Sequence, residues 1–168
     1  MKDMKKTLIV YGSTTGSCRE YAEKIAAKLN AEVADVTNLD TKKLAEYDNL
    51  LLGTSSWGAG EMQDDWYGGV KILKDSDLSG KTVALFGCGD SEGYSDTFCG
   101  GMSELYAAVA GSGAQVVGKV DASTYTYDDS ESVVDGNFVG LALDINEEDA
   151  KTEERISNWI DDIRPLLK

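Results

Sequence analysis

Short apolar segments rich in β-branched and aromatic residues alternate with amphipathic segments along nearly the whole chain. Residues 7–11 form the first apolar segment, and apolar residues then recur three and four positions apart over 19–29, the period of a helix. Strands that alternate with helices predict a parallel sheet covered on both faces, the doubly wound α/β class. The sequence predicts strands at 7–11, 32–36, 49–53, 82–87 and 115–118, and helices at 19–29, 41–47, 63–73, 97–111 and 147–166.

One region interrupts this alternation after the fifth predicted strand. Residues 120–138 are rich in Asp, Ser, Thr and Tyr, and an apolar segment resumes at 138–143. We interpret the region as an insertion that splits the last of five strands, within a single domain that spans residues 1–168. The insertion is either a docking surface, with Tyr125, Tyr127, Asp128 and Asp129 exposed, or a tolerated surface excursion. The sequence favours neither alternative.

The composition excludes several functional classes. The chain has 168 residues with 16 Lys and Arg against 30 Asp and Glu, a formal charge of −14, so it lacks the basic surface that nucleic acids require. The charge favours a basic protein partner, although it could equally serve solubility. The chain has no histidine, which removes Ser-His and Cys-His catalytic arrangements and His-ligated zinc.

The three cysteines and the absence of a long apolar stretch bear on the cellular compartment. Cys18, Cys88 and Cys99 show no CxxC spacing and cannot all pair, which is typical of reduced thiols. No segment approaches the roughly 20 apolar residues of a membrane span, and the apolar run after the basic start is too short for a signal peptide. We therefore expect a soluble, cytoplasmic monomer without a membrane partner.

Glycine clusters follow three of the predicted strands. Because the carboxyl ends of parallel strands meet at one edge of the sheet, three glycine-rich loops there favour a ligand site. A tight strand-to-helix turn explains glycine in any one loop, but less readily in all three. The clusters are Gly12 and Gly16, then Gly53, Gly58 and Gly60, then Gly87, Gly89 and Gly93.

The first of these loops has the chemistry of a phosphate site without a positive charge. It lacks the lysine of a nucleoside triphosphate loop. It offers the hydroxyls of Ser13, Thr14, Thr15 and Ser17 together with the backbone N–H groups of a helix start. Helix capping would account for one or two of these hydroxyls, but not for four.

Two aromatic residues stand in the other two glycine-rich loops. Trp57 and Tyr94 could clamp a flat ring between them at the same edge of the sheet. The loop 87–93 does not form a dinucleotide fingerprint, because Glu92 stands where the third glycine belongs and the loop follows the fourth strand rather than the first. A lysine-free phosphate loop beside two aromatic rings fits a phosphorylated planar cofactor, namely FMN.

With these motifs in place, the chain resembles the flavodoxins, in particular the long-chain flavodoxin subgroup, from end to end. The matching segments are 10–16, 57–58, 61–66, 86–90, 94, 98–100 and 136–144. The resemblance implies a flavodoxin-like five-stranded sheet of order 2-1-3-4-5 and non-covalently bound FMN.

The resemblance also implies a role for individual positions. Trp57 would stack on the inner face and Tyr94 on the outer face of the isoalloxazine, and Asp90 with backbone groups of Gly89 and Cys99 would bind its pyrimidine edge. Asn146 stands near the ribityl chain, where some long-chain members have Asp, and Cys18 stands where Thr is common. The implied cofactor-binding residues are Ser13, Thr14, Thr15, Gly16, Ser17, Cys18, Thr54, Ser55, Ser56, Trp57, Gly58, Ala59, Cys88, Gly89, Asp90, Tyr94, Thr97, Phe98 and Cys99.

The implied function is low-potential one-electron transfer between redox enzymes, with FMN passing through semiquinone and hydroquinone states. Such a protein is an electron carrier and not an enzyme. Its partners would be basic redox proteins, such as a flavodoxin/ferredoxin reductase, and low-potential acceptor enzymes. The alternatives are an FMN-dependent quinone or nitro reductase, which would need a substrate pocket and a nicotinamide site, and a non-catalytic FMN store.

Overall fold

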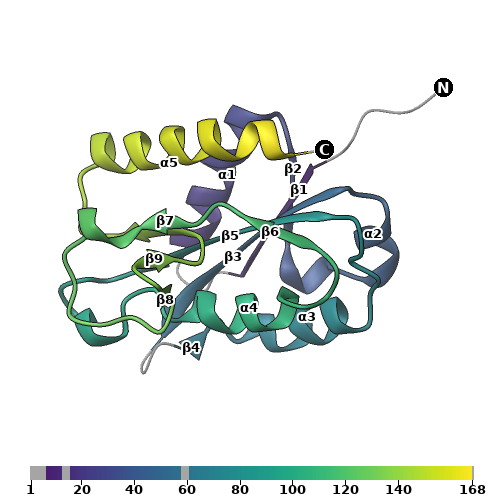
Figure 1. The fold of residues 1–168 in the computed structure, drawn as a ribbon, viewed down its shortest axis with the longest axis horizontal. Helices are drawn as coiled ribbons and strands as arrows, with labels where there is room; N and C mark the ends of the chain where they lie inside the picture. Colours follow the sequence, from purple (N-terminus) through teal and green to yellow (C-terminus); the bar gives the residue numbers. More distant parts are fainter. Residues whose placement is uncertain (1–6, 13–15, 58–60, 168) are drawn as a thin grey trace.

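The computed structural model describes residues 7–12, 16–57 and 61–167, and in this part of the chain a central sheet carries helices on both faces (Figure 1). The central sheet consists of β1 Thr7–Gly12, β2 Glu32–Asp35, β3 Asn49–Trp57, β4 Glu61–Met62, β5 Thr82–Gly89, β6 Gln115–Val117 and β10 Leu141–Asp144. The helices are α1 Ser17–Leu29, α2 Thr41–Ala45, α3 Asp65–Lys74, α4 Gly101–Val109 and α5 Asp149–Ile163. Short 3₁₀ turns lie at η1 Val36–Asn38, η2 Ser95–Thr97, η3 Ala122–Thr124 and η4 Arg164–Leu166.

The strand order confirms the predicted flavodoxin-like α/β class. The path through the sheet is β10-β5-β3-β1-β2, and every pair along it is parallel. Counted as the five predicted strands, this is the order 2-1-3-4-5. Parallel strands covered on both faces need apolar residues at nearly every position, and seven of the eight residues of β5 are buried.

The last strand is split, as the sequence predicts. β6 pairs with the first half of β5, where Thr82 is opposite Gln115 and Ala84 is opposite Val117. β10 pairs with the second half of the same strand, from Phe86 to Gly89. The intervening insertion holds a small antiparallel sheet, β7 Val120–Asp121, β9 Asn137–Phe138 and β8 Val133–Val134, in the order β7-β9-β8.

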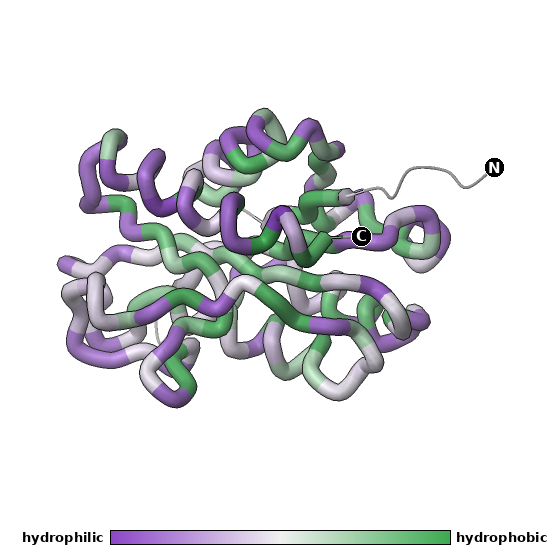
Figure 2. The backbone as a smooth tube through the Cα atoms, turned by 45° about the horizontal axis from the view of Figure 1, so that its top comes forward, coloured by the Kyte–Doolittle hydropathy of each residue, from purple (hydrophilic) through white to green (hydrophobic). Residues whose placement is uncertain are grey.

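Two hydrophobic cores lie on opposite faces of the central sheet. Successive residues of β5 point to opposite faces, so Leu85 joins the core under α3 and α4 while Phe86 joins the core under α1 and α5. Trp66 of α3 fills the first core, and Trp159 of α5 fills the second. Figure 1 shows these two helical layers above and below the sheet, and Figure 2 shows hydrophobic residues concentrated along the central strands.

Several predicted boundaries differ from those observed, and each difference has a local cause. The strand predicted at 49–53 runs on to residue 57 and turns back into β4, because the Thr54 hydroxyl accepts a hydrogen bond from the Gln63 N–H at 2.9 Å. The helix predicted at 97–111 is confined to α4. Cys99 has a φ of +52°, which a right-handed helix cannot contain, so the chain forms a 3₁₀ turn before α4 begins.

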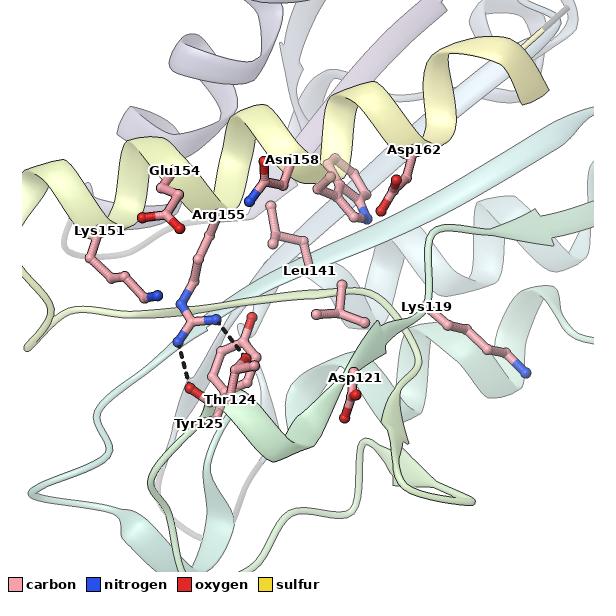
Figure 3. Close-up of a pocket in the computed structure, with 12 residues that line it drawn as sticks. Lys119, Asp121, Thr124, Tyr125, Leu141, Lys151, Glu154, Arg155, Asn158 and Asp162 are labelled. Atoms are coloured by element: carbon pink, nitrogen blue, oxygen red, sulfur yellow. Dashed lines mark hydrogen bonds between the residues drawn. The ribbon is translucent and has the colours of Figure 1, made fainter.

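Arg155 of α5 forms hydrogen bonds that connect this helix to the insertion. The side chain is only 8% exposed, and its guanidinium forms two hydrogen bonds to the Glu147 carboxylate, at 2.7 and 2.8 Å. It donates to the hydroxyl and the carbonyl of Thr124 at 3.2 and 3.0 Å and lies 3.7 Å from the ring centroid of Tyr125 (Figure 3). The buried charge is thus paired and hydrogen bonded, as stability requires.

The two tyrosines of the insertion face inward. Tyr125 and Tyr127 pack against Phe98 and Phe138, with ring centroids 4.8 to 6.2 Å apart. The Tyr125 hydroxyl donates to the Ala142 carbonyl at 2.8 Å, and burial raises the pKa of this phenol. The expectation that Tyr125 and Tyr127 are exposed is therefore wrong, since both rings are partly buried and pack against the core.

We predict that Arg155→Met lowers the free energy of unfolding by about 3–5 kcal/mol, because it leaves the Glu147 carboxylate partly buried without its partner. Lys24→Met serves as the control, since it breaks only the exposed 3.0 Å pair with Glu153. That change should cost less than about 1 kcal/mol. Urea unfolding of both variants checks the prediction, and equal losses would contradict it.

Candidate functional site

A cavity of about 190 Å³ opens at the carboxyl ends of β3 and β5. Its walls come from the start of α1, the ends of the two strands, the loop that follows β5 and the turn that follows β10. Open α/β sheets bind ligands at this edge. The residues that line the cavity are Ser17, Ser55, Ser56, Cys88, Gly89, Asp90, Tyr94 and Ile145.

The sequence predicted all of these lining residues except Ile145. Ile145 is 49% exposed although it is a large apolar residue, and it directly follows β10. Its position in the turn after a strand could have signalled it, but apolar residues near strand ends are common. Gly16, Cys18, Thr54, Thr97, Phe98 and Cys99 lie in the flanking segments without lining the cavity, Trp57 ends β3, and Ser13, Thr14, Thr15, Gly58 and Ala59 lie outside the described residues.

The start of α1 lies at this edge of the sheet, with Ser17 in the lining of the cavity. Gly16 occupies the N-cap with a φ of +97°, a conformation that favours glycine, and Ser17 begins the helix. The first N–H groups of a helix lack partners within it and attract anions. The Cys18 side chain is fully buried and hydrogen bonds with Cys88, so only the backbone N–H of Cys18 remains for an anion.

Ser55 carries a hydroxyl that points to a ligand. It is 8% exposed, and its Oγ has no hydrogen-bond partner within the described part of the chain. A buried polar atom without a partner costs roughly 1–3 kcal/mol, and Ser55 lines the cavity where a ligand could satisfy it. Thr82 Oγ1 also lacks a partner, but it lies at the opposite end of β5.

The neighbouring residues of β3 hold the strand end in place. The Ser56 hydroxyl accepts a hydrogen bond from the Gly101 N–H at 2.8 Å. A Cβ on Gly101 would lie 3.0 Å from Met62 Cα and 3.1 Å from the Ser55 carbonyl oxygen, so α4 packs directly against β3 and β4. This close packing fixes one wall of the cavity.

Gly89, which lines the cavity, is in close contact with a second backbone segment behind it. A Cβ on Gly89 would lie 2.8 Å from the Cys99 backbone nitrogen, so glycine lets the two segments approach. The insertion supports this second segment. Phe98 donates its N–H to the Asp129 carbonyl at 3.2 Å, and the Ser132 hydroxyl donates to the Cys99 carbonyl at 2.7 Å.

Asp90 and Tyr94 belong to one closed turn at the mouth of the cavity. Asp90 Oδ1 accepts hydrogen bonds from the N–H groups of Gly93 and Glu92, at 2.8 and 3.0 Å, and from the Asn146 amide at 2.7 Å. The Gly93 N–H and the Asn146 amide lower the pKa of this carboxyl. Tyr94 is 51% exposed, so its ring is available to stack on a planar ligand.

Taken together, the described lining offers hydroxyls, backbone groups and apolar side chains, and it includes no lysine or arginine. Within the ranges described, no group of three or more His, Cys, Asp or Glu side chains could hold a metal ion. None of the described helices is long and apolar enough to cross a membrane. The site therefore suits a ligand with a flat ring and an anionic group held by N–H and O–H donors.

A second cavity, of about 260 Å³, lies between α5 and the insertion (Figure 3). It is the larger of the two, but its most buried charged group, Arg155, is already committed to Glu147 and Thr124. The cavity also lies away from the strand ends where the predicted residues gather. We therefore take the cavity beside β3 and β5 as the candidate site.

Sheet order and cavity together define a doubly wound α/β protein with a candidate ligand site at the carboxyl edge of its sheet. The family model described as flavodoxin matches residues 9–159. Flavodoxin 1 of Azotobacter vinelandii is 42% identical over 165 residues, and the match covers 94% of each chain. A flavodoxin of Synechocystis is 36% identical over 169 residues, covering 98% of this chain and 99% of the relative. The chain belongs to the flavodoxin family.

Solved structures agree with this assignment. Fusobacterium nucleatum flavodoxin bound to flavin mononucleotide superposes with a TM-score of 0.91 at 32% identity, covering 98% of this chain and 100% of that chain. Oxidised Flavodoxin 2 of Bacillus cereus superposes with a TM-score of 0.75 at 25% identity, covering 96% and 99%. The fold expected from the resemblance is confirmed.

Two thiols behind the site have strongly perturbed acidities. The hydrogen bond with Cys88, together with burial, raises the pKa of Cys18 well above its ordinary value. Burial raises the pKa of Cys99 in the same direction. Both thiols therefore stay protonated in the folded protein at pH values where a free cysteine ionises.

We predict that the protein loses stability as the pH rises above about 8.5, where cysteines of the unfolded chain ionise. The folded state then binds more protons than the unfolded state, so each of the two thiols lowers the free energy of unfolding by up to about 1.4 kcal/mol per pH unit. Urea unfolding under reducing conditions at pH 7.5, 8.5 and 9.5 measures the slope. The double variant Cys18→Ala/Cys99→Ala should flatten it, and an unchanged slope would contradict the prediction.

Proposed function

We propose that this flavodoxin binds FMN non-covalently in the cavity beside β3 and β5 and acts as a low-potential one-electron carrier between redox enzymes. The observation that carries the proposal is the cavity itself. At the carboxyl edge of the sheet it combines a helix start, an available aromatic ring and a buried hydroxyl that has no partner among the described residues. A relative of the same fold is bound to flavin mononucleotide.

The residues present fit this cofactor. The helix start at Ser17 suits the phosphate, because backbone N–H groups and the helix dipole hold an anion without a lysine. Ser55 Oγ offers a buried hydrogen-bonding group that lacks a partner within the described ranges. When bound, FMN supplies reversible one-electron chemistry, and the protein supplies binding and orientation.

We propose three groups of contacts for the cofactor. Tyr94 and Trp57 would take the two ring faces, and Asp90, Gly89 and Cys99 the pyrimidine edge. The phosphate group would be held by Ser13, Thr14, Thr15, Gly16, Ser17 and Cys18. The remaining site residues would be Thr54, Ser55, Ser56, Gly58, Ala59, Cys88, Thr97 and Phe98.

The chain's own charge supports a low potential and a choice of partners. Carboxylates near the site, Asp90 among them, oppose the addition of negative charge to the cofactor. The net charge of −14 would steer basic partners, and we propose a flavodoxin/ferredoxin reductase as donor and low-potential enzymes as acceptors. We also propose that the chain acts as a single-domain monomer in the cytoplasm. The three unpaired cysteines are consistent with that compartment.

A quinone or nitro reductase is the less favoured alternative. Such an enzyme needs room for a nicotinamide and a substrate against the ring, as well as a group that delivers protons. The chain has no histidine for proton delivery. The chain is accordingly an electron-transfer flavoprotein rather than an enzyme.

Cofactor titration and turnover test the proposed function together. We expect protein freed of cofactor to quench FMN fluorescence at a stoichiometry of one to one and to bind riboflavin, which lacks the phosphate, more weakly. The FMN-loaded protein should not oxidise NADPH alone, but it should pass electrons once a flavodoxin/ferredoxin reductase is added. Failure to bind FMN overturns the proposal, whereas NADPH oxidation by this chain alone favours the reductase.

Tyr94→Ala should weaken FMN binding by roughly 5- to 150-fold, the range expected from about 1–3 kcal/mol for losing one aromatic stacking partner. Tyr94→Phe is the matched control, because it keeps the ring and removes only the hydroxyl. Its affinity for FMN should stay within about threefold of the wild type. Fluorescence titration measures both, and an equal loss in both variants would assign the effect to the hydroxyl instead.

A further inference from the structure

The Asn146 side chain joins two loops that form the mouth of the cavity. Its Nδ2 donates to Asp90 Oδ1 at 2.7 Å and to Asp144 Oδ1 at 3.0 Å. Asp90 belongs to the loop after β5, and Asp144 is the last residue of β10. One amide group thus connects carboxylates that are 54 positions apart in the sequence, since 144 − 90 = 54.

The Asp144 carboxylate anchors the other end of this connection. It is 8% exposed and accepts hydrogen bonds from the hydroxyl and the N–H of Ser91, the latter at 3.3 Å. It also accepts from the Asn146 N–H at 3.0 Å. The main chain adds one more link, because the Ile145 N–H donates to the Gly89 carbonyl at 3.0 Å.

The chemistry of the two carboxylates in this chain favours an amide at position 146. Ionised carboxylates only accept hydrogen bonds, whereas the amide nitrogen of asparagine has two hydrogens to donate. Asn146 satisfies both carboxylates at once and so offsets their mutual repulsion. An aspartate of nearly the same shape would place a third acceptor and a third negative charge between them.

We propose that Asn146 is a positioning residue that closes the FMN site by linking the loop that carries Tyr94 to the turn that carries Ile145. This inference rests on the proposed function. Tyr94 and Ile145 both line the cavity, so a link between their segments holds the aromatic wall over the ring of the cofactor and slows its release. The Asn146 side-chain amide is directed to Asp90 and Asp144.

Asn146→Asp tests the link, because it keeps the shape of the side chain and removes both donors. We expect FMN binding to weaken at least about tenfold, the factor expected for a hydrogen bond to a charged group, mainly through faster release. Asn158→Asp is the matched control. Asn158 is also an exposed asparagine, and it lies on α5 beside the other cavity, so the same charge is added away from the site. Stopped-flow fluorescence gives both rate constants.

Exchanging donor and acceptor distinguishes a specific link from a general loss of structure. In Asp90→Asn/Asn146→Asp, the new amide at position 90 can donate to the new carboxylate at 146. We expect this double variant to bind FMN at least about threefold more tightly than Asn146→Asp alone, because one charge-assisted hydrogen bond returns. Additive losses across the cycle overturn the proposal.

A measurement without cofactor separates failure of this inference from failure of the proposed function. In cofactor-free protein, Asn146→Asp should speed amide hydrogen exchange across residues 89–94 relative to Asn158→Asp. If the wild type binds no FMN, the proposed function fails, and the exchange rates still decide whether Asn146 links the loops. If FMN binds and the two asparagine variants behave alike in both measurements, Asn146 is not a positioning residue.

Discussion

The parallel pairing of β3 with β5 is the constraint on which the rest of the molecule depends. The register runs from Asn49 opposite Thr82 to Ser55 opposite Cys88, and side chains alternate between the two cores along both strands. A shift by one residue would move each side chain to the opposite core. Because both cores are closely packed, the register is fixed, and with it the relative position of the two strand ends that wall the cavity.

The insertion gains a structural role from this arrangement. Arg155 holds it to α5, and its aromatic rings share a cluster with Phe98. Phe98 and Cys99 form the segment that packs against Gly89, so the insertion braces one wall of the cofactor site from behind. The structure contradicts only the expected exposure of Tyr125 and Tyr127, while Asp128 and Asp129 are exposed, so a docking role of the insertion stays a prediction.

The chain is acidic, and the described lining of its cavity includes no lysine or arginine. The described lining of the cavity provides hydroxyls and a helix start instead. Without a cation in the described lining, the negative charge of the protein is not neutralised there. Its repulsion of added negative charge is consistent with a low reduction potential. Asn146 likewise acts without a positive charge, because its neutral amide donates hydrogen bonds to two carboxylates, Asp90 and Asp144.

The sequence by itself determined the fold class, the strand order through its family resemblance, the split last strand and seven of the eight residues that line the cavity. The fold class and the split strand follow from hydrophobic periodicity and turn residues, which are local patterns, whereas the strand order and most of the cavity residues came from the family resemblance. Only the tertiary structure showed that Ile145 joins the cavity, that the Cys18 thiol turns inward to Cys88, and that Asn146 bridges Asp90 and Asp144. Each of these depends on which segments distant in sequence become neighbours, and a local pattern does not encode the direction in which a side chain finds its partner.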